Sequence, residues 1–136
     1  MSIQETALAH VRVHDVMHTG ILTTDPSTPL RVVARLMADQ RVHAVAVADP
    51  YHARRPWAIV TTLDVAAAAG EGSDELAGQT AAGKEIVTVS SADGLAYAAR
   101  LMAERNVEHV IVIDPATGYP AGILSSLDVA AVYADC

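Results

Sequence analysis

The sequence predicts a mixed α/β (α+β) fold made of two β-α-β-β-α repeats that pack with pseudo-two-fold symmetry. The main observation is that four segments of the chain occur twice. Residues 21–23, 34–38 and 49–50 recur at a constant offset, since 86 − 21 = 65, and residues 61–67 recur at 125 − 61 = 64. Duplicated units usually cannot bury their apolar faces alone and complete each other by stacking.

Each repeat divides into the same five elements. A short extended segment opens it, at 20–24 and at 85–89, and a helix follows at 30–40 and at 95–105. The helices are indicated by apolar residues spaced three and four apart, which are Leu30, Val33, Ala34 and Met37, then Leu95, Ala98, Ala99 and Met102. Two β-rich runs follow, at 44–49 and 57–61 and at 109–114 and 121–125, and a short alanine-rich helix closes each repeat.

Local signals set the expected helix starts and the domain boundaries. Thr28 before Pro29 matches an N-cap with proline in the first turn, and Asp93 takes the equivalent place in the second repeat. Residues 1–19 are expected to be a helical lead-in. The predicted organisation is a first domain with its lead-in at 1–68, a Gly- and Ala-rich connector at 69–84, and a second domain at 85–136.

Composition narrows the function classes. The 136 residues suit one compact domain or two packed halves, and the apolar runs are too short to cross a membrane. A net charge of −7, with only nine Lys and Arg, argues against a nucleic-acid partner. Cys136 is the only cysteine, and no secretory signal is visible, so we expect a cytoplasmic protein.

A polar motif marks the junction between the last strand and the last helix of each repeat. The two copies are Thr61-x-x-Asp64 and Ser125-x-x-Asp128. A hydroxyl followed three residues later by an acid forms a helix capping box, which needs no ligand. The same groups also suit a nucleotide, because a helix N-terminus favours phosphate and a carboxylate accepts from ribose hydroxyls. Both interpretations stay open at this point.

The chain resembles a pair of cystathionine-β-synthase (CBS) domains over roughly residues 11 to 134. The resemblance lies in residues 42–49 with 58–65, in their second copy at 107–114 with 122–129, and in the lead-in 13–17. Ala58 stands where the family has the glycine that Gly122 retains. The family binds AMP, ADP, ATP or S-adenosylmethionine in clefts between its two domains, and it often forms disc-shaped dimers.

The resemblance implies a set of ligand-binding residues. Asp64 and Asp128 would hold ribose hydroxyls, and Thr61 and Ser125 would contact ribose or phosphate. The backbone of the opening strands would read the adenine edge, and aliphatic side chains would flank the base. These residues are Ile21, Thr23, Ile86 and Thr88 from the opening strands, with Val45 and Val110. His109 lies at the start of a strand. It either donates a hydrogen bond to a phosphate or forms its hydrogen bonds within the fold.

The sequence therefore predicts a non-catalytic regulatory module that binds an adenosine nucleotide, forms a homodimer and signals to a protein partner. No cofactor, metal or membrane partner is expected, and no catalytic elbow or Walker loop is present. One alternative is a ligand-free assembly module whose polar motifs are only helix caps. Another is a metal-binding protein that uses His10, His14 and His18, which are spaced by four.

Overall fold

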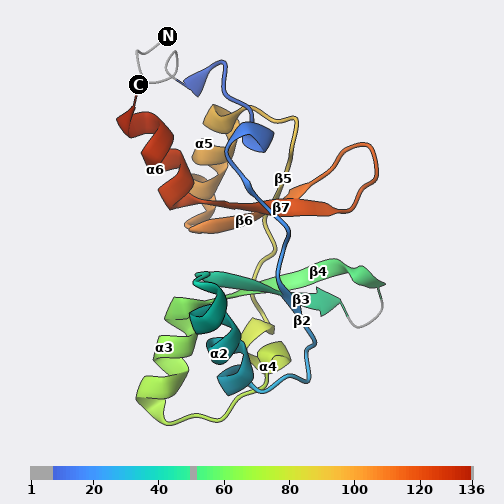
Figure 1. Cartoon of the computed structure of the whole chain (residues 1–136), viewed down its shortest axis with the longest axis vertical. Helices are drawn as coiled ribbons and strands as arrows, with labels where there is room; N and C mark the ends of the chain where they lie inside the picture. Colours follow the sequence, from blue (N-terminus) through green and yellow to red (C-terminus); the bar gives the residue numbers. More distant parts are fainter. Residues whose placement is uncertain (1–7, 50–51, 136) are drawn as a thin grey trace. The chain divides into compact units, whose positions relative to one another are not determined.

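The chain forms two compact units (Figure 1). The computed structural model describes residues 8–49 and 52–135, without the side chains of residues 49 and 52–57. Pro50, Cys136 and the first seven residues of the predicted helical lead-in lie outside the described residues. One unit consists of Leu22–Ile86, and the other combines Val87–Cys136 with Met1–Ile21. We call them the 22–86 unit and the 87–136 unit. Each unit therefore contains most of one repeat together with the segment that precedes the other repeat.

The 22–86 unit is a three-stranded sheet with three helices. Its strands are β2 (Thr23–Thr24), β3 (Ala44–Asp49) and β4 (His52–Thr61), in the order β2-β3-β4. β2 is parallel to β3, and β3 is antiparallel to β4. The helices are α2 (Leu30–Gln40), α3 (Thr62–Glu71) and α4 (Ala77–Ala81), and they lie on one side of the strands (Figure 1).

The 87–136 unit repeats this plan with one additional strand. Its sheet has the order β1-β7-β6-β5, formed by β1 (His18–Thr19), β5 (Thr88–Ser90), β6 (His109–Ile113) and β7 (Pro120–Ser125). The helices are α5 (Leu95–Arg105) and α6 (Ser126–Ala134), and a 3-10 turn, η1 (Val13–Asp15), precedes β1. The predicted mixed fold with two small sheets is confirmed.

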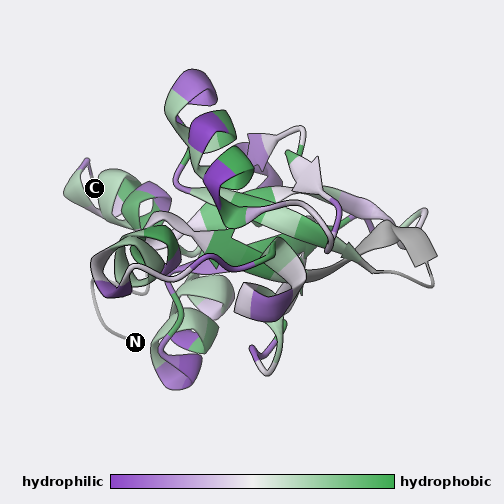
Figure 2. Ribbon diagram, turned by 90° about the horizontal axis from the view of Figure 1, so that it is seen from below, coloured by the Kyte–Doolittle hydropathy of each residue, from purple (hydrophilic) through white to green (hydrophobic). Residues whose placement is uncertain are grey.

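Burial explains why these segments take these conformations. On α2, the buried residues Leu30, Val33 and Met37 repeat at helical spacing, and on β3 the core residues Val45 and Val47 alternate as a strand requires. Hydrophobic residues concentrate on the strands, whereas the helices carry both polar and apolar residues (Figure 2). Both long helices end at a residue in the left-handed region, and these residues are Arg41 at φ 55° and Asn106 at φ 53°.

The predicted caps of the two long helices need a correction. The N-cap of α2 is Pro29, not Thr28, because the Pro29 carbonyl accepts the first helical hydrogen bond, from Val33 at 3.2 Å. The N-cap of α5 is Gly94, not Asp93. The Asp93 carboxylate instead accepts from the backbone N–H of Ser90 at 2.9 Å, which closes the turn before the helix.

Candidate ligand-binding sites

The first polar motif forms a complete capping box at the junction of β4 and α3. Thr61 is extended (φ −108°, ψ 165°), and its Oγ1 atom accepts from the Asp64 backbone N–H at 3.3 Å. In return, Asp64 Oδ2 accepts from the Thr61 backbone N–H at 2.8 Å and from the Thr61 hydroxyl at 3.0 Å. The box thus fixes the orientation of the Asp64 carboxylate.

A lysine from the connector completes this site. Lys84 Nζ donates to Asp64 Oδ2 and, at 3.4 Å, to the carbonyl oxygen of Ile59 on β4. The side chains are partly enclosed, with 32% of Lys84 and 21% of Asp64 exposed. All three donors to Asp64 meet the same oxygen, and no described residue donates to its other oxygen, Oδ1. The carboxylate therefore keeps one oxygen for a further donor.

The environment of Asp64 determines its ionisation. Partial burial by itself raises the pKa of the carboxyl group, but the hydrogen bond from Lys84, those from Thr61 and the positive charge of Lys84 outweigh it. The pKa of Asp64 is therefore lower than the ordinary aspartate value. The group remains a carboxylate, and hence a pure hydrogen-bond acceptor, at physiological pH.

The second polar motif forms the same box between β7 and α6, but a histidine takes the place of the lysine. Asp128 Oδ2 accepts from the Ser125 backbone N–H at 2.8 Å, and Ser125 Oγ accepts from the Asp128 N–H at 3.1 Å. His18 Nε2 lies 2.9 Å from the other oxygen, Oδ1. Asp128 is 13% exposed, whereas the His18 side chain is 76% exposed. The histidine thus covers the outer oxygen from the solvent side.

His18 and Lys84 take corresponding places in the duplicated chain. They differ by 84 − 18 = 66 positions, and each precedes the opening strand of its repeat. Each contacts the aspartate of the other repeat, Asp128 or Asp64. Neither residue was predicted from the sequence to have this role. The sequence contains one indication of this role, because both residues lie at a similar distance before the opening strands of the two repeats.

Glycine is needed at position 122 because of packing within the chain and not because of a ligand. A Cβ atom at this position would lie 2.3 Å from the carbonyl oxygen of His18 and 3.2 Å from the Met17 sulfur. Thr19 pairs with Gly122 where β1 joins β7. Ala58, the equivalent residue on β4, packs its methyl group in the core of the 22–86 unit. The difference between the two repeats therefore reflects the additional strand in only one of them.

Comparison with known proteins identifies the family. The model of the CBS domain matches the chain twice, at residues 13–71 and 81–135. The chain belongs to the CBS domain family. Within it, the chain is a tandem CBS pair, and no catalytic family is indicated. A search of the curated proteins gave no match.

Several solved CBS pairs have the same fold. The CBS domain protein PAE2072 from Pyrobaculum aerophilum, complexed with AMP, is 25% identical with a TM-score of 0.80, over 92% of this chain and 97% of its own. The CBS pair of protein MJ0100, in complex with 5'-methylthioadenosine and S-adenosylmethionine, is 17% identical with the same TM-score and coverage. CBSX2, in complex with AMP, is 22% identical with a TM-score of 0.73, over 92% and 97%.

Of the other residues predicted to bind the ligand, Thr23, Thr88 and His109 lie on strands, whereas Ile21 and Ile86 precede β2 and β5. Thr23 pairs with Ala46, Thr88 pairs with Ile111, and His109 pairs with Ser125 and is half-buried. Ile21 and Ile86 are the last residues before the chain passes from one unit to the other. Neither isoleucine is fully buried.

Val45 and Val110 have a different environment. Both are fully buried in the hydrophobic clusters of their units, where the helices cover the sheet. A side chain enclosed in a core does not reach a ligand unless the core opens. Both valines therefore contribute to the cores of their units, and their contact with an adenine base stays a prediction.

The N-terminal histidines do not form a metal centre within the described chain. No group of three or more metal-ligating side chains occurs among the residues that the structure describes. Their four-residue spacing would align them only on a helix, but this segment forms the turn η1 and the strand β1. His14 Nδ1 lies 3.2 Å from Asp15, and His18 contacts Asp128.

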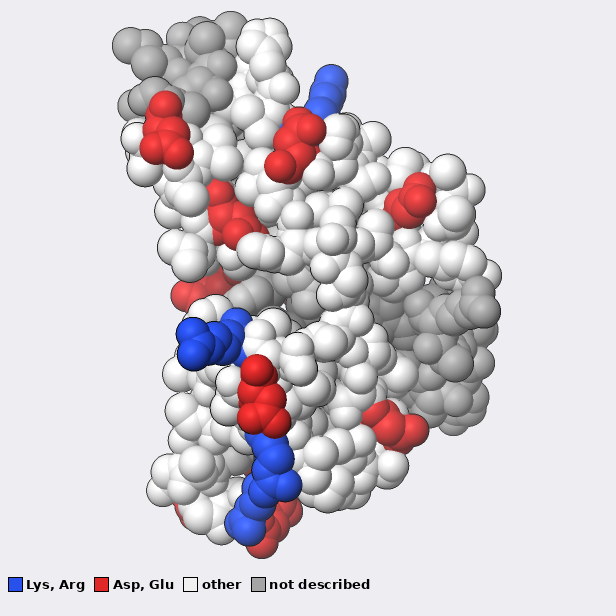
Figure 3. Space-filling model, viewed as in Figure 1, with Lys and Arg blue, Asp and Glu red and all other residues white. Residues whose placement is uncertain are grey.

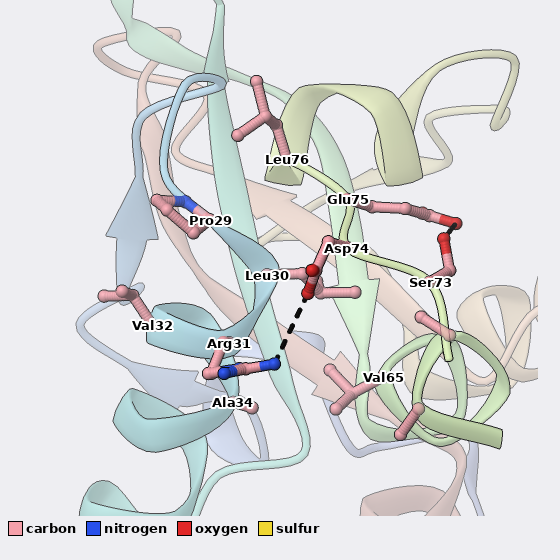
Figure 4. Close-up of a pocket in the computed structure, with 12 residues that line it drawn as sticks. Pro29, Leu30, Arg31, Val32, Ala34, Val65, Ser73, Asp74, Glu75 and Leu76 are labelled. Carbon is pink, nitrogen blue, oxygen red and sulfur yellow. Dashed lines mark hydrogen bonds and ion pairs between the residues drawn. The ribbon is translucent and has the colours of Figure 1, made fainter. Parts of the chain in front are cut away.

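A separate pocket of about 450 Å³ lies in the 22–86 unit (Figure 4). It is bordered by α2, α3 and the segment 73–76, and its lining is mostly apolar. Arg31 and Asp74 meet across it at 3.4 Å, although both side chains are highly exposed. Neither Thr61 nor Asp64 lines this pocket, so it is distinct from the capping-box site.

The charged side chains of the surface show no basic patch on the face that is drawn in Figure 3. On the face shown in Figure 3, acidic side chains are scattered, and the few basic side chains form no continuous stripe.

Among the described residues, no helix has both the length and the apolar composition needed to span a bilayer.

Proposed function

We propose that this CBS pair is a non-catalytic regulatory module that binds an adenosine-containing ligand, AMP, ADP, ATP or S-adenosylmethionine, at Asp64 and Asp128. The observation that carries the proposal is the duplicated carboxylate. Each aspartate is fixed by a capping box through Oδ2, while Oδ1 is held by no described residue at Asp64 and only by the exposed His18 at Asp128.

The chemistry of the two sites suits a nucleoside. A carboxylate that accepts from two adjacent ribose hydroxyls forms charge-assisted hydrogen bonds, worth roughly 1.5–3 kcal/mol each. The first turns of α3 and α6 present backbone N–H groups that favour a phosphate. Thr61 and Ser125, at the N-caps, lie where the ribose meets that phosphate. The half-buried His109, beside Ser125, is a further donor in this proposal.

The comparisons support the ligand class. PAE2072 and CBSX2 are described in complex with AMP, and MJ0100 with 5'-methylthioadenosine and S-adenosylmethionine. All of these compounds contain an adenosine group. An adenosine ligand is therefore the simplest common occupant for a CBS pair with two intact ribose carboxylates.

The positions of His18 and Lys84 in the chain suggest how ligand binding becomes a signal. His18 lies four residues before Leu22, and Lys84 lies three residues before Val87, where the chain enters the other unit. A ligand that takes up the carboxylates changes the contacts of both connecting segments. It thereby favours one conformation of the pair over another, which a partner protein reads. The partner and a cytoplasmic location, expected from the sequence, are parts of this proposal.

The proposal includes a homodimer. Corresponding helices of both units expose apolar side chains, namely Val32 on α2 and Tyr97 on α5, and Leu63 on α3 and Leu127 on α6. Leu63 and Leu127 are 72% and 69% exposed. Apolar residues that recur at equivalent exposed positions favour an interface between copies of the chain.

The alternative is an assembly module in which the motifs act only as caps. It is favoured by one observation: both capping boxes are complete without a ligand, and each aspartate already contacts a side chain from another segment, Lys84 or His18. Under this alternative, the exposed helix residues carry the function and the carboxylates carry only stability.

A thermal-shift screen with adenosine, AMP, ADP, ATP and S-adenosylmethionine separates the two. A ligand that binds only the folded state adds about 2.7 kcal/mol at a hundredfold excess over Kd. We expect at least one compound to raise the melting temperature. Unchanged melting with all five at millimolar concentration, together with flat calorimetry, contradicts the proposal and favours the assembly module.

A further inference from the structure

We propose that Lys84 makes the Asp64 site selective for anionic adenosine ligands, those that carry a phosphate, over neutral or cationic ones. The inference rests on the proposed function and specifies the ligand class at one of its two sites. It assigns a specificity-determining role to a residue of the connector.

The contacts of Lys84 leave it beside a bound ribose rather than in its place. Lys84 meets Asp64 at Oδ2, the oxygen already used by the capping box, so Oδ1 remains for ribose hydroxyls. The Ile59 carbonyl holds the ammonium group from a second side at 3.4 Å. A ribose on Oδ1 therefore has no need to displace the lysine.

The ammonium group retains bonding capacity for an anion. A lysine carries three N–H donors, and two of them have acceptors, on Asp64 and Ile59. Among the described residues the third donor has no acceptor, so it can donate to a phosphate oxygen. Lys84 is also 32% exposed, so a ligand in solvent can approach it directly.

The local charge at the Asp64 site determines which ligands the site prefers. With Lys84 in place, the Asp64 site is locally neutral and presents an ammonium group to the ligand. Without Lys84, the site keeps the uncompensated carboxylate in a chain whose net charge is −7, and it repels a phosphate. Removal of the lysine should therefore weaken the binding of AMP and leave the affinity for adenosine almost unchanged. It should strengthen the binding of S-adenosylmethionine, which carries a positively charged sulfonium group.

The Asp128 site lacks this arrangement. His18 contacts Oδ1, the oxygen that a ribose would use, and its side chain is 76% exposed. A ligand at Asp128 therefore competes with His18 for the carboxylate, whereas a ligand at Asp64 shares the site with Lys84. The two sites of one CBS pair are expected to differ in ligand preference.

Isothermal titration with adenosine, AMP and S-adenosylmethionine tests the inference. The Asp128→Ala background confines binding to the Asp64 site. There we expect AMP to bind about tenfold more tightly than adenosine, a difference of about 1.4 kcal/mol. The further change Lys84→Met should reduce this ratio to within about threefold, and Lys84→Arg should preserve it. Arg35→Met, which removes an exposed cation on α2, is the control for net charge and should leave the ratio unchanged.

The outcomes separate the inference from the proposed function. If AMP and adenosine bind but their affinity ratio is the same with Lys84→Met as with Lys84, the selectivity is overturned while adenosine binding stands. If the unsubstituted protein binds none of the five compounds of the thermal-shift screen, the proposed function fails and the inference fails with it. Lys84→Gln provides the same comparison if Lys84→Met does not fold, as judged by its thermal melt.

Discussion

His18 and Asp128 are 110 residues apart in the sequence, yet His18 Nε2 lies 2.9 Å from Asp128 Oδ1. The contact depends on β1, a strand of two residues that pairs antiparallel with β7 and brings the N-terminal segment against the second repeat. Lys84 and Asp64 form the corresponding contact in the 22–86 unit. Both aspartates that are expected to bind ribose are thus already contacted by nitrogen-bearing side chains, His18 and Lys84, and a ligand must share or replace these contacts.

Substitution of Gly122 tests the contact between β1 and β7. In Gly122→Ala, the new Cβ atom would lie 2.3 Å from the His18 carbonyl oxygen, so β1 must shift or separate from the sheet. We expect the free energy of unfolding to fall by about 1–3 kcal/mol, as for an overpacked site, measured by urea denaturation. Gly70→Ala is the control, because a Cβ atom there would have no neighbour within 4 Å and α3 gains a better helix former. Equal stability of Gly122→Ala and the unsubstituted protein would contradict this packing of β1 on β7.

The ionisation of Asp64 predicts a specific dependence of stability on pH. The pKa of Asp64 is lower in the folded protein than its ordinary value of 3.8, so the unfolded chain binds the proton first as the pH falls. The stabilisation is therefore complete above the unfolded value and is lost as the pH falls through the lower folded value. The gap in unfolding free energy between the unsubstituted protein and Asp64→Asn should be constant above about pH 5 and shrink under acid.

Two comparisons make this measurement specific. In Lys84→Met, Thr61 alone remains to lower the pKa of Asp64, so the folded pKa moves back towards the unfolded value and the loss of stability under acid should be smaller. The pKa of Asp25 is also lowered, chiefly by the backbone N–H of Ser27, but it titrates alike in all variants and cancels in the difference. A gap that does not change with pH would show that Asp64 is not held as a carboxylate by these contacts.

The exposed apolar residues predict the oligomeric state. We expect light scattering at tens of micromolar to give the mass of a dimer. Val32→Glu should shift the mass towards the monomer, since it places a charge on an apolar helix surface. Gln40→Glu adds the same charge at an exposed position at the end of α2 and should leave the dimer intact. A monomeric mass for the unsubstituted protein would refute the homodimer.

The sequence predicts the longer elements well, because their periodicity is local. Both long helices have their expected ends, at Gln40 and Arg105, and β3 has the expected bounds, Ala44–Asp49. Helix and strand periods reflect which residues are buried, and burial is encoded within the segment itself. The N-caps differ by one residue from those expected because Pro29 and Gly94 form the caps through backbone geometry, which a side-chain pattern does not encode.

The features that the sequence does not predict depend on distant contacts. His18–Thr19 has no strand pattern of its own and becomes β1 only by pairing with β7. The two capping boxes were predicted because their partners are three residues apart, whereas Lys84 and His18 reach them from elsewhere in the chain. The burial of Val45 in the core with Val47 likewise depends on the packing of β3 against distant elements.

Calorimetric titration of AMP into the unsubstituted protein and into the double variant Asp64→Ala, Asp128→Ala tests the central claim most directly. Each substitution also removes half of a capping box, which costs about 1 kcal/mol of stability, so the melting temperature of the variant must be measured alongside. We predict saturable binding to the unsubstituted protein and an affinity at least about tenfold weaker in a double variant that remains folded. Equal affinities in the two folded proteins would contradict the assignment of the two aspartates as ribose ligands.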